Sequence, residues 1–158
     1  MGTDLLDLGG KSAVVIGGGG VLAGAMAEGL AGAGASVAVF DYHKENAEAR
    51  AASIQSKGRK AIAIHGDASK KADLERGLQA VRDAFGGLDI LINAAGVNSG
   101  TPFFEIAESE WQRIIDINLK SVFLACQVFG KAMVKSGRGG AIINISSVSS
   151  GPPLSKVF

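Results

Sequence analysis

The stretch VVIGGGGVLAGAMAEGL, from Val14 to Leu30, decides the fold of this chain. A short apolar run of β-branched residues meets four consecutive glycines, Gly17 to Gly20, and small apolar residues follow at helical spacing. This order is typical of a strand, a tight turn and a helix. Glycines in such a turn let backbone N–H groups and the positive end of the helix approach a phosphate closely. We therefore expect a dinucleotide to bind here, with a tight turn that merely packs well as the alternative.

Outward from this turn, apolar strands alternate with helices along the chain. We predict strands at residues 11–16, 35–40, 60–65, 88–92 and 141–145. We predict helices at residues 22–30, 43–57, 74–85 and 115–133, the last with the option of a short helix before it around Trp111. In the first helix, Leu22, Met26 and Leu30 predict the apolar face, whereas the composition of the second predicts a solvated helix. Five strands joined by right-handed crossovers predict an α/β fold, a Rossmann-type doubly wound parallel sheet with strand order 3-2-1-4-5.

Composition excludes several classes of protein. The 158 residues, 47% hydrophobic and 20% charged, predict a single dinucleotide-binding domain over residues 1–158. The net charge of +1 suggests neither a nucleic-acid partner nor an anionic membrane surface. Cys126 is the only cysteine, so no intramolecular disulfide can form and a reducing compartment is the simpler assumption. No apolar run approaches the roughly 18 residues of a membrane span, and acidic residues stand where a signal peptide is basic, so we expect a cytoplasmic protein.

Asp41 makes the nucleotide interpretation more specific. It stands at the end of the second predicted strand, 24 residues after Gly17, where a carboxylate can accept hydrogen bonds from a ribose diol. The same carboxylate would repel a 2′-phosphate. Tyr42 and His43 follow it, rather than Arg or Lys, so we expect NAD rather than NADP. A solvated strand end is the alternative interpretation of Asp41.

Further landmarks follow in order. They are the turn from Ile16 to Ala23, Asp67, the segment Asn93-Ala94-Ala95-Gly96, Asn118, and Ile145-Ser146-Ser147. In this order and spacing the chain resembles the short-chain dehydrogenase/reductase family from Lys11 through at least Ser149. The resemblance implies that Asp67 holds the adenine, that the segment after the fourth strand lines the cofactor ribose, and that Asn118 and Ser147 are catalytic. The predicted cofactor-binding residues are Gly17, Gly18, Gly19, Gly20, Leu22, Asp41, Tyr42, Asp67, Ala68, Asn93, Ala94, Ala95 and Gly96.

The glycine turn departs from the T-G-x-x-x-G-x-G pattern of that family. Ile16 replaces the threonine, and Val21 and Ala23 occupy the second and third glycine positions. The glycines Gly18 to Gly20 are therefore expected to reshape the turn and its phosphate contacts. This G-G-G-G-V-L version resembles a branch assigned to sugar-acid oxidoreductases, which is a hint about the substrate.

The residues themselves also support the two catalytic candidates. Asn118 lies within an apolar helical stripe, where its amide calls for a partner; an exposed polar position is the alternative. Ser147 follows the fifth predicted strand, at the edge where doubly wound sheets bind ligands, although other serines surround it. His43 and His65 are better explained as a helix-start residue and a strand residue than as catalytic bases. No His, Cys and carboxylate cluster has ligand spacing, so we predict no metal.

The resemblance also implies a Tyr-x-x-x-Lys pair as proton donor. The only tyrosine is Tyr42, at the wrong end of the sheet, and the family register places the catalytic tyrosine two positions beyond Phe158. We therefore expect an amino-terminal part of a longer enzyme, with a sheet truncated before its sixth strand. Its fifth strand would be an apolar, unpaired edge, so these 158 residues alone are expected to be inactive and to self-associate.

These observations lead to one main hypothesis and two alternatives. The main one is an NAD(H)-dependent oxidoreductase that interconverts a secondary alcohol and a ketone, with a sugar acid or polyol as candidate substrate. In it, Asn118 supports a proton-relay water and Ser147 polarises the carbonyl. The alternatives are a non-catalytic nucleotide-binding module and an inactive fragment. We expect a small-molecule alcohol or ketone as partner and, at full length, a homo-oligomer that uses the helix around Leu119 to Met133.

Overall fold

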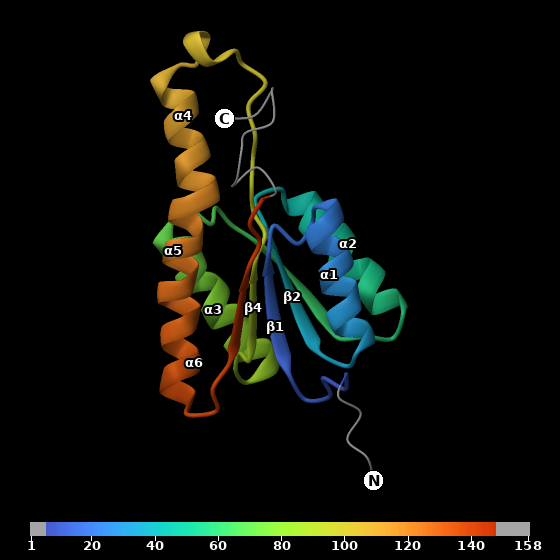
Figure 1. Ribbon diagram of the computed structural model, residues 1–158. Helices are drawn as coiled ribbons and strands as arrows, with labels where there is room; N and C mark the ends of the chain where they lie inside the picture. The colour runs from blue at the N-terminus through green and yellow to red at the C-terminus, as the bar shows by residue number, and fades with distance from the viewer. Residues whose placement is uncertain (1–5, 148–158) are drawn as a thin grey trace.

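The computed structural model describes residues 6–147 and contains the predicted doubly wound sheet (Figure 1). Its five strands are parallel and follow the order β3-β2-β1-β4-β5, which confirms the predicted fold and strand order. The strands are β1 (Ser12–Ile16), β2 (Ser36–Asp41), β3 (Ala61–His65), β4 (Ile90–Asn93) and β5 (Ala141–Asn144). The α-helices are α1 (Val21–Gly32), α2 (Lys44–Ser56), α3 (Lys71–Phe85), α4 (Glu108–Ile115), α5 (Ser121–Ala125) and α6 (Lys131–Ser136). A 3₁₀ turn, η1 (Phe103–Glu105), and two π-helical segments, η2 (Asp116–Lys120) and η3 (Cys126–Gly130), complete the described elements.

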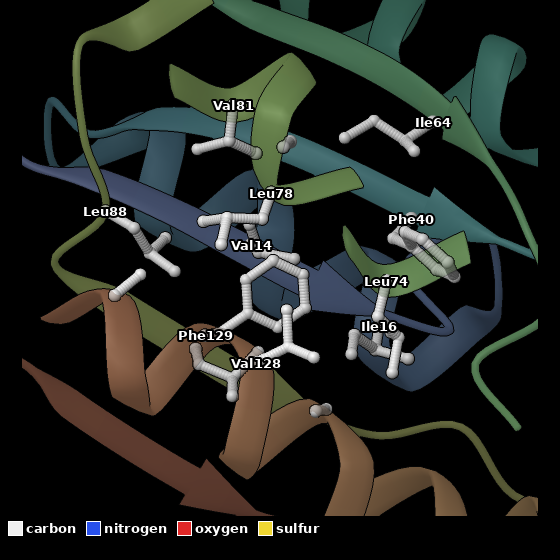
Figure 2. Close-up of a cluster of buried hydrophobic side chains, with 14 of the residues drawn as sticks. Val14, Ile16, Phe40, Ile64, Leu74, Leu78, Val81, Leu88, Val128 and Phe129 are labelled. Atoms are coloured by element: carbon white, nitrogen blue, oxygen red, sulfur yellow. The ribbon is translucent and has the colours of Figure 1, made fainter. Parts of the chain in front are cut away.

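Helices cover both faces of the sheet (Figure 1). Successive strand residues point to opposite faces, so Val14 packs on the side of α3 and α6 while Val15 packs on the side of α1 and α2. The first side is filled by large groups, with fully buried Phe40 and Phe129 in the same cluster (Figure 2). The second side is filled mainly by alanines. The strands are therefore apolar on both faces, as a covered parallel sheet requires.

Helix α1 buries a different face from the predicted one. Ala23, Ala27 and Ala31 face the sheet and are at most 4% exposed, whereas Leu22 is 60% exposed. Met26 and Leu30 are partly buried and pack against that cluster, so only Leu22 of the predicted face lies fully outside it. Small side chains let the helix backbone approach β1 and β2 closely, so small size, rather than hydrophobicity, decides which face is buried.

Helix α2 is not the solvated helix that its composition predicts. Ala47, Ala51 and Ile54 are buried and belong to the cluster on this side of the sheet. The helix contacts β2 and β3, so its small residues lie on the covered face while its charged residues remain outside. Gly58 follows the helix with φ of +72°, in the left-handed conformation expected of a terminating glycine.

One helical run extends from α4 through η2, α5 and η3 to α6. It begins at Glu108, seven residues before the predicted start, and Trp111 belongs to α4 rather than to a separate helix. By length and composition alone this run could cross a membrane, but Lys120 and Lys131 interrupt its apolar residues, so it contains no uninterrupted apolar run of that length. Its buried residues include Phe129 and pack against the sheet.

Strand β5 forms one edge of the sheet in the described part of the chain. Within residues 6–147 it pairs with β4 and with no other strand. Ile142 and Ile143 are 40% and 48% exposed, and Ile145 directly after the strand is 36% exposed. This is the apolar edge that the sequence predicts.

Candidate functional site

The carboxyl ends of the strands converge on one cleft. The register pairs Ile16 with both Phe40 and Asn93, so β1, β2 and β4 end at the same level. The chain leaves β1 and β4 toward opposite faces, which opens a crevice between them. The cleft has a volume of about 880 Å³, within the usual range for a ligand site. Its walls come from the strand ends, the start of α2 and the helical run from α4 through η2 to the start of α5.

The cleft contains most of the predicted cofactor-binding residues. Those that line it are Gly17, Gly20, Asp41, Tyr42, Asp67, Ala68, Ala94, Ala95 and Gly96. Those that do not line it are Gly18, Gly19, Leu22 and Asn93; the two predicted catalytic residues, Asn118 and Ser147, do not line it either. Leu22 points away from the sheet-facing side of its helix, and Asn93 is only 3% exposed. Tyr42, by contrast, is 64% exposed beside the cleft, with its ring edge-on to His43.

The glycine turn is compressed between neighbouring elements. Gly17 has φ of +78°, and a Cβ there would lie 3.0 Å from the backbone of Ala95. A Cβ on Gly19 would lie 2.6 Å from the Cβ of Asn46 in α2. Position 19 therefore needs glycine because α2 lies against it, a requirement that the family pattern does not contain. Helix α1 begins at Val21 without a side-chain cap, which leaves its first N–H groups available to an anion.

The Asp41 carboxylate joins the turn to α2. It is 7% exposed, so it is not a solvated strand end. Gly19 N–H donates to Oδ2 at 3.0 Å, and His43 N–H donates to Oδ1 at 2.9 Å. The His43 imidazole Nδ1 lies 3.6 Å from the same Oδ1. Each carboxylate oxygen retains further acceptor capacity, so Asp41 can hold the turn and still accept a hydrogen bond from a ligand.

Asp67, after β3, is held in a fixed orientation. Burial raises the pKa of its carboxyl, but hydrogen bonds from the Ser69 backbone and hydroxyl and the ammonium of Lys70 outweigh burial and lower the pKa. The backbone N–H of Asp67 donates in turn to Asp73 Oδ2 at 2.8 Å. The carboxylate is therefore charged at neutral pH and lies at the cleft wall beside Ala68.

Asn118 finds the partner that its position in the helix calls for. Val97 N–H donates to its Oδ1 at 2.8 Å, and its Nδ2 donates to Val97 O, also at 2.8 Å. The residue is exposed and lies in the π-helical segment η2, a kind of distortion that is frequent at functional sites. The side chain fixes the backbone directly after Gly96, which lines the cleft.

Asn93 acts inside the sheet rather than in the cleft. Its Nδ2 donates to Asn144 Oδ1 at 2.8 Å across β4 and β5, and it also lies 3.5 Å from Cys126 Sγ. This amide pair ties the end of β5 to the end of β4. Ser147, three residues beyond Asn144, is exposed at the same edge of the sheet.

Sequence reasoning missed one wall of the cleft. The α4 side contributes Ser109, Gln112, Arg113, Asp116, Ile117 and Ser121. These residues recur at spacings of three and four and lie on one helical face, a signal that was present in the sequence. Asn46 of α2 was also missed; nothing in its helix distinguishes it until the structure brings it to Gly19.

Comparison with known proteins identifies the family. The profile that describes short chain dehydrogenases matches residues 11–157. The chain belongs to the short-chain dehydrogenase family. A solved short-chain type dehydrogenase/reductase from Mycobacterium marinum superimposes with a TM-score of 0.90 at 35% identity, covering 93% of this chain and 60% of that one.

Several of the similar proteins are named after sugar-related compounds. The chain is 37% identical to an uncharacterized oxidoreductase of Bacillus subtilis, over 96% of its own length and 59% of the relative's. It is 37% identical to D-threitol dehydrogenase of Mycolicibacterium smegmatis, covering 89% of this chain and 54% of that protein. It is 31% identical to 5-keto-D-gluconate 5-reductase of Escherichia coli, and the match covers 93% of this chain and 58% of that protein. The chain thus spans a little over half the length of these relatives.

The family and the fold imply a nicotinamide cofactor, and the cleft fits one. Gly17 and Gly20 of the glycine turn line the cleft, the start of α1 presents uncapped N–H groups, and Asp41 supplies acceptors for hydroxyl groups. This donor and acceptor set matches a dinucleotide with a pyrophosphate and two riboses.

Proposed function

We propose that this protein is an NAD-dependent dehydrogenase that interconverts a secondary alcohol and a ketone on a polyol or sugar acid. The observation that carries the proposal is the buried Asp41 carboxylate, which lines the cleft while it is bonded to the glycine turn. Relatives named for threitol and for keto-gluconate support the substrate class.

The preference for NAD rests on charge. A ribose 2′-hydroxyl can donate to Asp41, whereas a 2′-phosphate placed there would meet a carboxylate in a largely buried position. Tyr42 and His43 follow, and neither supplies the permanent positive charge that an arginine would. The chain therefore presents an acceptor, and no fixed cation, directly at this strand end.

The proposed roles of the other residues follow from their positions. The nicotinamide cofactor supplies the group that exchanges hydride with the substrate. Ser147 donates a hydrogen bond to the substrate oxygen, where negative charge increases in the transition state. Asn118 fixes Val97 and holds a water in the proton path. The family's Tyr-x-x-x-Lys pair, which the resemblance implies as proton donor, has no counterpart in residues 1–158.

Two measurements on the protein at its natural length test this function. Fluorescence titration with NADH and NADPH is expected to show saturable binding of NADH and affinity at least about tenfold weaker for NADPH. A panel of polyols and sugar acids, followed by the absorbance of the reduced nicotinamide, then tests turnover. Binding of neither nucleotide would refute the proposal, and NADH binding without turnover of any alcohol would leave the nucleotide-binding module in its place.

A further inference from the structure

Arg50 of α2 reaches the start of α1. Its Nη2 donates to the carbonyl of Gly20 at 3.4 Å, and the same carbonyl accepts the N–H of Gly24 at 2.9 Å in the first turn of α1. Gly20 is the last residue of the glycine turn and lines the cleft. A guanidinium from the second helix therefore lies against the turn that leads into the first.

Gly24 provides the space for this contact. A Cβ at position 24 would lie 2.5 Å from Arg50 Cζ, far too close for any side chain to fit beside the guanidinium. Gly24 lies inside α1, where glycine is less favourable than alanine by about 1 kcal/mol. Gly24 therefore lowers the stability of α1, but its missing side chain leaves the space that the Arg50 guanidinium occupies.

An ion-pair network holds Arg50 in this place. Its Nη1 donates to Glu28 Oε1 at 2.6 Å, and Lys57 Nζ lies 2.7 Å from the other Glu28 oxygen. The Arg50 side chain is 25% exposed. Its Nε is buried and, within residues 6–147, has no hydrogen-bond partner. Glu28 belongs to α1, so the network locks α2 onto α1.

The position of the charge is unfavourable for the helix alone. A cation near a helix N-terminus opposes the helix dipole; the first turn of α1 contains no acidic residue, and Glu28, further along the helix, is shared between Arg50 and Lys57, so this group of three carries one excess positive charge. An anion at the same end would gain from both the dipole and the guanidinium. The arrangement is thus better suited to a helix start with a bound anion than to one without.

We propose that Arg50 is a positioning residue for the pyrophosphate of the dinucleotide, acting through the Gly20 carbonyl and the first turn of α1. The inference rests on the proposed function. It also explains how a turn that lacks the second and third family glycines can bind phosphate. Helix α2 packs closely against Gly19, and Arg50 of that helix donates a hydrogen bond to the carbonyl of Gly20, so α2 fixes the conformation of the turn.

The test compares phosphate-bearing and phosphate-free ligands by calorimetry on the protein at its natural length. Arg50→Met keeps the length of the side chain but removes the charge, and we expect affinity for ADP to fall about fivefold, the size of a helix-terminal charge effect. Affinity for adenosine, which lacks phosphate, is expected to stay within about twofold. Lys57→Met is the matched control, since it removes the other cation on Glu28 without touching the turn.

The outcomes separate the two proposals. If wild-type protein fails to bind ADP and NADH, the proposed function fails. If wild type binds both but Arg50→Met binds ADP equally well, or loses ADP and adenosine in parallel, the role of Arg50 is overturned. Should Arg50→Met not fold, Arg50→Gln replaces it; it removes the charge but keeps a side chain that can donate hydrogen bonds, and unchanged ADP affinity would equally refute the inference.

Discussion

The Asp41 carboxylate shows how one side chain can serve the ligand and the fold together. Its two oxygens each accept a backbone N–H, one from the glycine turn and one from the start of α2. Loss of this carboxylate therefore removes more than a ribose acceptor. The turn itself would lose one of the bonds that hold it against β2.

Asp41→Asn separates these two contributions. The amide can still accept one N–H through Oδ1, but its NH₂ would face the other donor, so we expect a stability loss of about 1–2 kcal/mol. Because the negative charge is gone, the preference for NADH over NADPH should shrink about tenfold or more. Thermal unfolding and titration with both nucleotides measure the two effects. Asp83→Asn, on the outer part of α3, is the control, and an unchanged NADH preference in Asp41→Asn would contradict the charge argument.

Glu28 makes stability depend on pH in a defined window. Hydrogen bonds from Lys57 and then Arg50 lower its pKa from the ordinary 4.5 to about 2. A lowered pKa in the folded state means stability that is present above pH 4.5 and is lost as the pH falls toward 2. Glu28→Gln should therefore lower Tm at pH 7. The difference in Tm between the variant and the wild type should become smaller below pH 4.5.

Denaturation curves between neutral and acidic pH check this expectation. Glu48→Gln is the matched control, because its ion pair with Lys44 is exposed to solvent and should contribute little. A difference in stability between Glu28→Gln and the wild type that stays constant through the acidic range would contradict the role assigned to Glu28.

At the scale of elements, Asn118 joins a helix to the loop after β4. Both polar atoms of its amide bond the backbone of Val97, in the way that a neighbouring strand would. Asn118→Ala should leave that loop without its anchor and cost about 1–2 kcal/mol of stability. Hydrogen exchange at the Val97 amide is expected to accelerate, while Gln79→Ala on α3 should leave it unchanged. Slow exchange at Val97 in the Asn118 variant would show that the loop is held by other contacts.

Periodicity predicted the elements better than it predicted their faces. Strand order and all five strands were predicted correctly, because apolar runs and glycine punctuation are local signals. The buried face of α1 was predicted wrongly because the distance to the sheet selects Ala23 and Ala27 over Leu22. Asn46 and Arg50 could not be predicted to touch the glycine turn, since their contacts depend on how α2 packs against α1.

At the scale of the whole molecule, the long helical run exposes apolar side chains. Leu119, Phe123 and Val134 are 63%, 61% and 81% exposed along this run. Exposed apolar side chains gathered on one element mark a candidate interaction site. We propose that a second copy of the chain covers it.

Phe123→Lys tests this assembly. A charge among these apolar residues is expected to shift the protein toward monomer in analytical ultracentrifugation, because burying an unpaired ammonium in an apolar contact is costly. Lys135→Glu is the control. Lys135 belongs to the same helical run but lines a groove between that run and α3, so its charge can change without placing a charge among the exposed apolar residues. An unchanged sedimentation coefficient for Phe123→Lys would exclude this face as the interface.

The common level at which the strands end restricts how this protein can vary. Hydrogen bonds continue one residue past β1, β3 and β4: Gly17 N–H donates to Phe40 O, Gly66 N–H to Asp41 O, and Ala94 N–H to Ile16 O. A one-residue deletion within β2 would turn Asp41 to the opposite face and move it off the level of Gly17. Length changes are therefore tolerable only in the connections at the far, amino-terminal edge of the sheet. Among homologues, gaps should accumulate at that edge, while the distance from each strand to its site residue stays constant.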